Sequence, residues 1–289
     1  MIDVSNNLNN QQTIAKPIFI NGIGLHTGTD VSMKLCPAGA DYGIKFIRKD
    51  LIDNNIVDAV WSNVSSTNLS TTISNKYGAK VSTIEHLMSA LSGLHIDNIK
   101  IEISGPEVPI MDGSSIKFVD MIDSTSTKTL NKKRKILKVK KNIKVEKNNT
   151  SAELKPNNQF SIDFEIDFPS KFISQQSCQL QLINGNYKTD IASARTFGFE
   201  KDVDMLRSNG LALGGSLDNA VVVGENKILN SDGLRFKDEF VRHKILDSIG
   251  DLYLAGAPIQ AYFLGNKSGH HLNYLLLRSL FSDKNNYEY

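Results

Sequence analysis

The sequence of 289 residues has little cysteine, no long apolar run and no excess of charge of either sign. Its two cysteines, Cys36 and Cys178, are too few for a disulfide framework or a thiolate-rich zinc site, which favours a reducing compartment. No run of about 18 apolar residues occurs, so we expect no stable membrane insertion. The 33 basic and 31 acidic side chains nearly cancel, which argues against a protein that coats nucleic acid.

The first twelve residues lack the basic and apolar segments of a secretory signal, so we expect a cytoplasmic protein. Hydrophobic residues make up 40% of the chain and charged residues 22%, which excludes a mainly disordered chain. At roughly 150 residues per domain, the length suggests about two domains.

Short alternating segments and segments with helical spacing follow one another along the chain. The apolar patterns predict strands at residues 16–21, 31–35, 42–48, 99–103, 161–168, 220–223 and 259–264, and helices at 82–94, 116–122, 200–208, 238–255 and 271–281. The polar stretch 124–135 has no apolar periodicity and is the best candidate for a boundary. We therefore expect an N-terminal domain over residues 1–126 and a C-terminal domain over 136–289. No sequence repeat relates the two halves.

Nine basic residues and one acid, Glu146, lie between Lys132 and Lys147. One interpretation is a patch that binds phosphate or nucleic acid. The other is a solvated linker followed by a strand whose outer face carries lysine. The alternation of lysine with valine or isoleucine favours the second interpretation, so we expect no nucleic-acid partner.

His243 and Asp247 lie four residues apart in the predicted helix 238–255, so both side chains share one face. This geometry suits two ligands of one zinc ion. The alternative is a His–Asp pair on the surface of a helix. Asp251, one turn further on, extends the same acidic face.

Ser82 and Glu85 have the spacing of a capping box at the start of the predicted helix 82–94. The alternative makes His86 a metal ligand and Glu85 a general base. Adjacent helical residues point about 100° apart, so they can address one ion and its water from two sides. A catalytic zinc site needs three protein ligands and one open position, which His86, His243 and Asp247 would supply.

Two further segments carry histidine next to glycine. His270 and His271 follow Gly269 at a strand-to-helix junction, which suits either a general acid or a helix-capping histidine. His26 lies in a glycine-rich segment, residues 22–28, which is typical of a tight turn and lacks the glycine spacing of a dinucleotide-binding loop.

Several motifs occur in a fixed order along the chain, and they are specific in combination. They include Gly22-Ile-Gly-Leu-His-Thr-Gly28, Val81-Ser-Thr-Ile-Glu-His-Leu87, Pro106-Glu-Val-Pro-Ile-Met-Asp-Gly-Ser114, Ala194-Arg-Thr-Phe-Gly-Phe199, Asp238 to Asp251 and Lys267-Ser-Gly-His270. In this order the sequence resembles the bacterial zinc-dependent UDP-3-O-acyl-N-acetylglucosamine deacetylases, which catalyse the committed step of lipid A biosynthesis. The first dozen residues and 125–185 are poorly covered.

The resemblance implies an α+β fold of two similar domains, each a sheet plus two helices, with the helices packed between the two sheets. It implies a βαβ insertion at about 197–223 that forms a passage for the acyl chain of the substrate. Leu206, Leu211 and Ala212 would line this passage, although composition alone would place them in the core. It also implies a monomer that binds Zn²⁺ and UDP-3-O-acyl-N-acetylglucosamine.

The resemblance assigns the zinc ligands to His86, His243 and Asp247. Glu85 would accept a proton from the attacking water, and Thr196 would stabilise the oxyanion. His270, kept charged by Asp251, would protonate the leaving amine.

Substrate contacts follow from the same resemblance. Lys244 and Lys267 would meet substrate oxygens and the diphosphate, and Phe197 would pack on the sugar ring. His26 would lie near the site.

The sequence departs from the family at two positions: Ser70 replaces a cysteine that some members carry near the metal, and His271 stands where a small residue is expected. A zinc hydrolase of the same fold that acts on another acylated amide is the main alternative.

Overall fold

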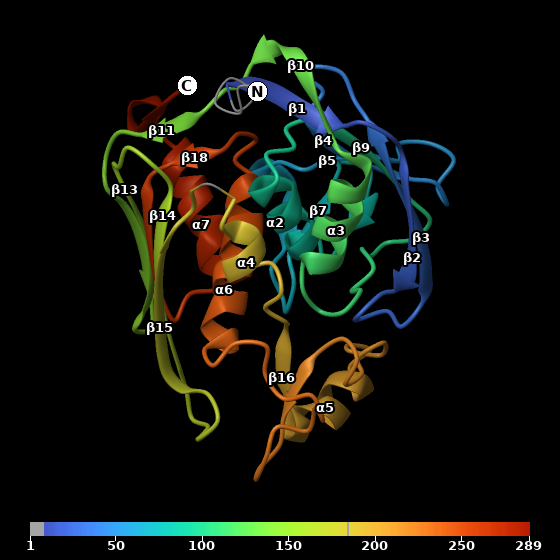
Figure 1. Cartoon of the computed structure of the whole chain (residues 1–289), viewed down its shortest axis with the longest axis vertical. Coiled ribbons are helices and arrows are strands. Elements are labelled where there is room, and N and C mark those ends of the chain that lie inside the picture. The colour runs from blue at the N-terminus through green and yellow to red at the C-terminus, as the bar shows by residue number, and fades with distance from the viewer. Residues whose placement is uncertain (1–8, 184) are drawn as a thin grey trace.

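The structure is a computed structural model that describes residues 9–183 and 185–289 (Figure 1). Residues 1–8, on which the expectation of no secretory signal partly rests, lie outside the described residues. Within the described ranges, no helix has both the length and the apolar character needed to cross a membrane.

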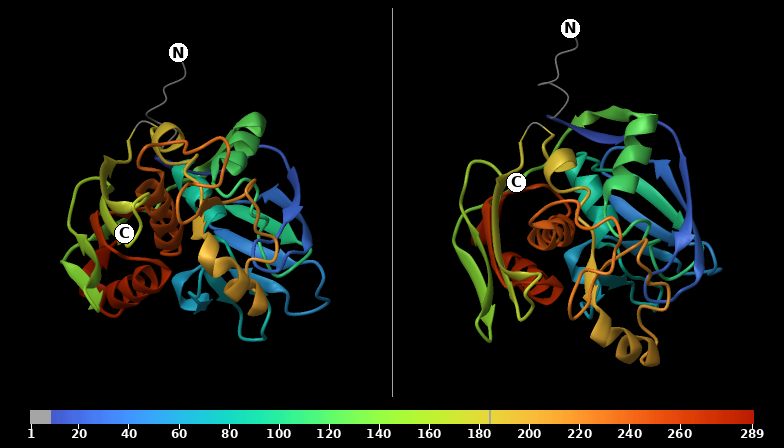
Figure 2. Two further views of the ribbon diagram at one scale, coloured as in Figure 1. Left: turned by 90° about the horizontal axis from the view of Figure 1, so that it is seen from below. Right: turned by 60° about the horizontal axis from the view of Figure 1, so that its bottom comes forward.

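Two five-stranded sheets form the outer layers, and helices fill the space between them (Figures 1 and 2). The first sheet has the order β2 (Ile18–Ile23), β3 (Asp30–Pro37), β9 (Ile99–Ile103), β4 (Ile44–Arg48) and β5 (Ile56–Asp58). The second has the order β12 (Ile143–Lys147), β13 (Thr150–Lys155), β19 (Tyr262–Asn266), β14 (Ser161–Phe168) and β15 (Ser174–Gln181). The inner layer consists of α2 (Glu85–Gly93), α3 (Ile116–Thr125), α6 (Glu239–Tyr253) and α7 (His270–Phe281).

The two sheets have the same topology. In each, the first two strands form a hairpin, the last strand pairs antiparallel with the second and parallel with the third, and the fourth closes the edge. In each half, one helix of the inner layer precedes the last strand and one follows it. The expected α+β fold of two similar halves is confirmed, although no sequence repeat announces it.

Burial follows the sequence pattern in the strands and departs from it in two helices. Along β3 and β14, buried and more exposed residues alternate, as expected for sheets covered on one face. In α2, by contrast, every residue from Glu85 to Leu91 is buried, including Glu85, His86 and Ser89. In α6, His243, Asp247 and Asp251 are buried too. Buried polar groups are costly unless they are paired, so these two helices mark a functional site.

The polar segment 124–135 differs from the linker that its composition predicts. Most of it forms β10 (Thr127–Lys133), which pairs antiparallel with β1 (Asn10–Ile14). Its side chains are almost all exposed, whereas most of β1 is buried, so β1 supplies the packing of this two-stranded ribbon. The division into residues 1–126 and 136–289 stays a prediction.

Each half carries an insertion between its fourth strand and its central helix. In the first half it is a small sheet of β6 (Val64–Ser66), β7 (Thr72–Ser74) and β8 (Lys80–Val81), preceded by the 3₁₀-helix η1 (Trp61–Asn63). In the second half it comprises α4 (Tyr187–Asp190), β16 (Phe197–Phe199), η2 (Glu200–Asp202), α5 (Val203–Ser208) and β17 (Val221–Val223). β16 and β17 run parallel with α5 between them, which is a βαβ element in the expected range.

The last strand of the chain belongs to a small three-stranded sheet in the second half. There β11 (Leu137–Val139) pairs with β18 (Ile259–Gln260) and with β20 (Tyr287–Glu288), which follows the 3₁₀-helix η3 (Lys284–Asn286).

The capping-box interpretation of Ser82 and Glu85 is wrong. Helix α2 begins at Glu85, its N-cap is Ile84, and no side chain caps it. The Ser82 hydroxyl instead donates to the carbonyl of Pro106, and Glu85 accepts a hydrogen bond from the backbone of Thr71. Both residues are used by partners distant in the sequence, which a local pattern does not reveal.

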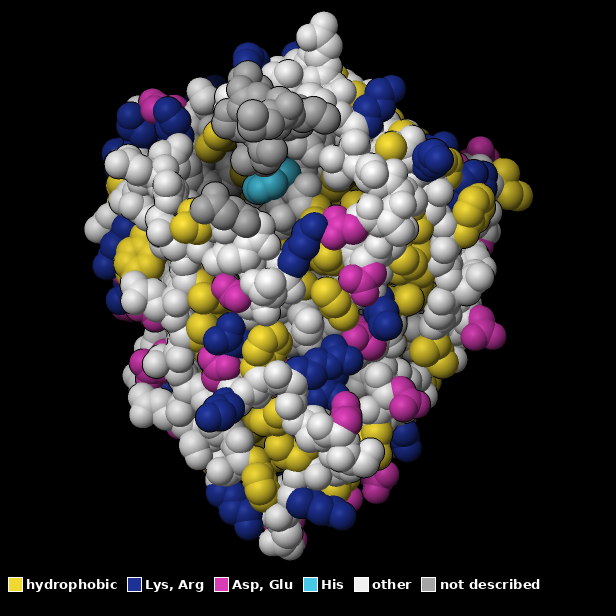
Figure 3. Space-filling model, viewed as in Figure 1, with side chains coloured by type: hydrophobic (Ala, Val, Ile, Leu, Met, Phe, Trp, Pro, Cys, Tyr) yellow, Lys and Arg dark blue, Asp and Glu magenta, His cyan; other side chains and the backbone are white. Residues whose placement is uncertain are grey.

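The basic segment between Lys132 and Lys147 is partly neutralised by carboxylates. The basic residues that form ion pairs with acids are Lys132, Arg134, Lys140, Lys141 and Lys144. Basic and acidic side chains are also interspersed over the face drawn in Figure 3.

Candidate metal centre

The site lies where α2 and α6 touch. A side chain at Gly250 would place its Cβ 2.0 Å from the carbonyl oxygen of Glu85, so the two helices approach backbone to backbone. This contact fixes the first turn of α2 against the C-terminal part of α6. It explains how Glu85 and His86 come to lie beside Asp247 and Asp251.

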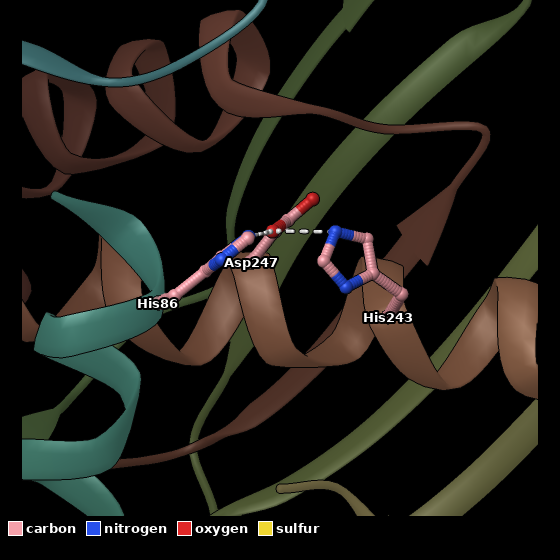
Figure 4. A group of neighbouring side chains, drawn as sticks. All are labelled: His86, His243 and Asp247. Carbon is pink, nitrogen blue, oxygen red and sulfur yellow. Dashed lines mark ion pairs between the residues drawn. The ribbon is translucent and has the colours of Figure 1, made fainter. Parts of the chain in front are cut away.

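Two imidazoles converge on one carboxylate oxygen in this contact (Figure 4). The distance to Asp247 Oδ1 is 3.5 Å from His86 Nε2 and 3.3 Å from His243 Nε2. The three side chains are buried, and their donor atoms lie within 4.8 Å of one another. Among the described residues, no hydrogen-bond donor reaches Asp247 Oδ1, which is buried. A buried carboxylate oxygen with no donor is the feature that a cation would satisfy.

The protonation states suit a cation. His243 Nδ1 lies 3.1 Å from the carbonyl of Ala194, which can only accept, so this nitrogen donates and Nε2 carries the lone pair. Burial lowers the pKa of His243 to about 3, so the ring is neutral at pH 7.

The carboxylate of Asp247 is also held in a state that suits a cation. Burial opposes the charge on Asp247, but the ammonium group of Lys244 helps to hold the pKa of this carboxyl well below its usual range. Lys244 Nζ donates to Oδ2 at 2.7 Å, which leaves Oδ1 toward the imidazoles. Two imidazole nitrogens and one carboxylate oxygen are a donor set that fits a divalent ion such as zinc.

A carboxylate and a histidine that are not part of this trio lie beside it. Glu85 Oε1 is 4.0 Å from His270 Nε2, and His270 Nδ1 is 2.9 Å from Asp251 Oδ2. Burial alone would lower the pKa of His270, but the Asp251 carboxylate and its hydrogen bond outweigh burial and raise that pKa to about 9. Burial raises the pKa of Glu85, although the nearby histidines oppose this. The arrangement holds a proton on one side of the site and an acceptor on the other.

Sequence analysis missed two residues that hold this pair. Thr71 donates its backbone N–H to Glu85 Oε2 at 3.0 Å and its hydroxyl to Asp251 Oδ1 at 2.5 Å. Asn273 Nδ2 donates to Asp251 Oδ2 at 2.9 Å. Asn273 lies three residues after His270 on α7, a spacing that places both on one face of the helix and could have revealed it.

Thr196 and Phe197 enter the site from the start of the βαβ element. The backbone N–H of Thr196 donates to Gly113 O at 2.7 Å, which ties this element to the first half. The ring of Phe197 packs edge-on against those of His243 and Phe240, with centroids 6.2 and 4.9 Å apart. Phe197 therefore stands next to a candidate ligand.

His26 lies where the first half meets the βαβ element. Its ring Nδ1 accepts a hydrogen bond from the backbone N–H of Ala212 at 3.4 Å, and its backbone N–H donates to Glu107 Oε1 at 2.9 Å. Burial lowers the pKa of His26, the Glu107 carboxylate opposes this, and the charge of His270 adds to the lowering. Leu206 and Leu211 are half-buried in the same element, where Leu211 N–H donates to Leu206 O.

Two cations expected at the substrate are paired with carboxylates. Lys244 is bound to Asp247, and Lys267 Nζ donates to Asp167 at 2.7 Å. Lys267 still borders the site, because it lines a surface cavity together with Lys147 and His270.

The two adjacent histidines, His270 and His271, have different partners. Ser70, which departs from the family pattern, is a buried residue. His270 faces Asp251, whereas the exposed His271 lies 3.4 Å from the hydroxyl of Thr67. Ser70 is buried directly before Thr71.

The fold and the site define a class: a metallohydrolase built from two topologically matching α+β halves around a shared His–His–Asp centre. Residues 11–282 match the family model of UDP-3-O-acyl N-acetylglycosamine deacetylase, LpxC. The chain is 44% identical over 277 residues to the UDP-3-O-acyl-N-acetylglucosamine deacetylase of Syntrophus aciditrophicus, covering 96% of this chain and 88% of that protein. It is 43% identical over 279 residues to the Brucella melitensis enzyme of the same name, covering 96% and 97%. The chain belongs to this deacetylase family.

Proposed function

We propose that this protein hydrolyses the acetamide of UDP-3-O-acyl-N-acetylglucosamine, releasing acetate and the free 2-amine, as the committed step of lipid A biosynthesis. The observation that carries the proposal is the convergence of a metal-ligand trio, a buried carboxylate and a charged histidine at the contact of α2, α6 and α7. Membership of the deacetylase family supports the substrate.

We assign Zn²⁺ to the trio of His86, His243 and Asp247. Two imidazoles and one carboxylate leave a position open, as in catalytic rather than structural zinc sites. A bound zinc ion would supply Lewis acidity, which polarises a carbonyl and makes a water molecule more acidic.

The surrounding side chains then move the protons. Glu85 accepts a proton as the water oxygen forms its bond to the acetamide carbon. Thr196 and the charged His270 stabilise the tetrahedral oxyanion, an electrostatic effect worth several kcal/mol in such sites. His270 gives its Nε2 proton to the departing nitrogen as the carbon–nitrogen bond breaks, and Asp251 at Nδ1 keeps the ring charged and oriented.

The remaining residues bind the substrate. Phe197 packs against the sugar ring, and Lys267 exchanges Asp167 for the diphosphate. Lys244 remains beside Asp247 and meets substrate oxygens. His26 borders a passage for the acyl chain that is lined by Leu206, Leu211 and Ala212. We expect a cytoplasmic monomer with no nucleic-acid partner.

Acetate release from the zinc-loaded protein tests the proposal. Three substrates are compared: the complete one, one without the 3-O-acyl chain and one without uridine diphosphate. Turnover that needs both groups is expected. An intact acetamide after incubation would contradict the proposal, and cleavage of other acylated amides at equal rates would favour a different zinc hydrolase of this fold.

A further inference from the structure

Thr71 lies just before β7, in the insertion of the first half, and only 2% of its surface is exposed. It donates two hydrogen bonds to carboxylates from different halves of the molecule. Its backbone N–H reaches Glu85 Oε2 on α2, and its hydroxyl reaches Asp251 Oδ1 on α6. One residue therefore touches both groups that flank the proposed proton transfers.

The hydroxyl has a distinct task at Asp251. His270 and Asn273 both donate to Oδ2 of that carboxylate, and among the described residues the Thr71 hydroxyl is the donor that reaches Oδ1. An ionised carboxylate only accepts hydrogen bonds, so the hydroxyl proton must point at Asp251. Without it a buried oxygen is left unsatisfied and the carboxylate is free to turn.

We propose that Thr71 is a positioning residue that fixes the orientation of the base, Glu85, relative to the acid, His270. The backbone N–H fixes the orientation of Glu85, while the hydroxyl fixes the plane of Asp251 and, through it, the ring of His270. The 4.0 Å separation of Glu85 Oε1 and His270 Nε2 is set by these two bonds. This inference rests on the proposed deacetylation.

The geometry separates positioning from a purely structural role. Neither bond of Thr71 reaches a surface expected to bind the substrate, so loss of the hydroxyl should not weaken binding. It should slow the chemical step, because both proton transfers depend on alignments of a few tenths of an ångström.

Thr71→Val tests this, because valine keeps the shape and the backbone N–H but lacks the hydroxyl. We expect kcat to fall about 10- to 100-fold, as for other residues that orient catalytic groups, with KM within about twofold and zinc content unchanged. Thr71→Ser, which keeps the hydroxyl, should restore most of kcat. Thr72→Val, the same change at the next residue, is the matched control and should behave as wild type.

A kcat for Thr71→Val within about twofold of wild type would overturn the inference. So would a Thr71→Ser variant whose kcat is as low as that of Thr71→Val. Should the valine variant not fold, Thr71→Ala removes the same hydroxyl without placing an extra methyl beside Asp251, and the same kcat loss is expected. In a double-mutant cycle of Thr71→Val with Asp251→Asn, the loss of kcat in the double variant should be smaller than the product of the two single losses. A loss equal to that product would also overturn the inference. Absence of acetate release by the wild-type protein would instead contradict the proposed function.

Discussion

The first and second halves of the molecule share a sheet topology but contribute different chemistry. The central helices α2 and α6 occupy matching places, yet α2 brings Glu85 and His86 in its first turn, whereas α6 brings His243, Asp247 and Asp251 at successive turns along one face. The later helices differ more: α7 begins at the charged His270, while α3 brings none of the proposed catalytic residues. A shared topology therefore supplies a scaffold, and function depends on which helix positions carry reactive groups.

The insertions differ in the same way. The small sheet of the first half delivers Thr71 to the carboxylates, and the βαβ element of the second delivers Thr196 and Phe197. Thr71 thus reaches across to Asp251 of the second half, whereas Phe197 packs against His243 of its own half. The comparison predicts that, where residues of both halves serve one step, substituting the residue of either half should lower turnover by a similar factor.

The largest effect should come from the metal ligands. His86→Ala in the first half and His243→Ala in the second should each lose metal and reduce turnover about 10³-fold or more, since a Lewis acid contributes several kcal/mol. Metal content by atomic spectroscopy and acetate release measure both. A variant that keeps stoichiometric zinc would show that one half alone holds the ion.

The next effect should come from the proton-transfer groups. Glu85→Gln and His270→Ala should each lower kcat about 10²- to 10⁴-fold while the protein keeps its zinc. Single-turnover rates at saturating substrate measure this. Near-normal turnover of His270→Ala would point to His271 or another acid.

Removal of the carboxylate beside His270 should have a smaller effect, which depends on pH. Wild-type kcat should fall as the pH rises through about 9, where His270 loses its proton. Asp251→Asn should move this fall toward neutral pH and lower kcat about 10- to 100-fold. Because the pKa of His270 in the folded state lies above its unfolded value of about 6.5, the charged ring also stabilises the fold fully below pH 6.5, and this stability is lost as the pH rises through about 9. An unchanged alkaline limb in a kcat–pH profile would remove Asp251 from this role.

The smallest effect should come from the contact between the halves. Gly250→Ala would press a methyl group onto the Glu85 carbonyl and should destabilise the fold by about 1–3 kcal/mol. Gly39→Ala is the matched control, because nothing lies within 4 Å of its added Cβ. Equal free energies of unfolding in urea for the two variants would show that α2 and α6 have room to separate.

Much of this arrangement follows from local sequence. The four-residue spacing of His243 and Asp247 and the motif around His86 point to three side chains that the structure brings together. Thr71 carries no such signal, because its partners lie 14 and 180 residues away. Ser82 was misleading for the same reason, since its hydroxyl bonds to Pro106 rather than to its own helix. Local sequence patterns also do not show that the two sheets have the same topology. Strand order is set by pairing between distant segments, and apolar segments of unrelated sequence can form the same pairs.

The burial of α2 has a consequence for biosynthesis. Its residues from Glu85 to Leu91 are covered on all sides, and α6, which it touches at Gly250, is encoded in the last fifth of the chain. At the usual speed of translation, the first half waits on the order of ten seconds before its partner helix leaves the ribosome. During that interval Glu85, His86 and the apolar face of α2 lack the α6 surface that covers them in the folded protein, so the future active site is a stretch of exposed apolar surface in the nascent chain.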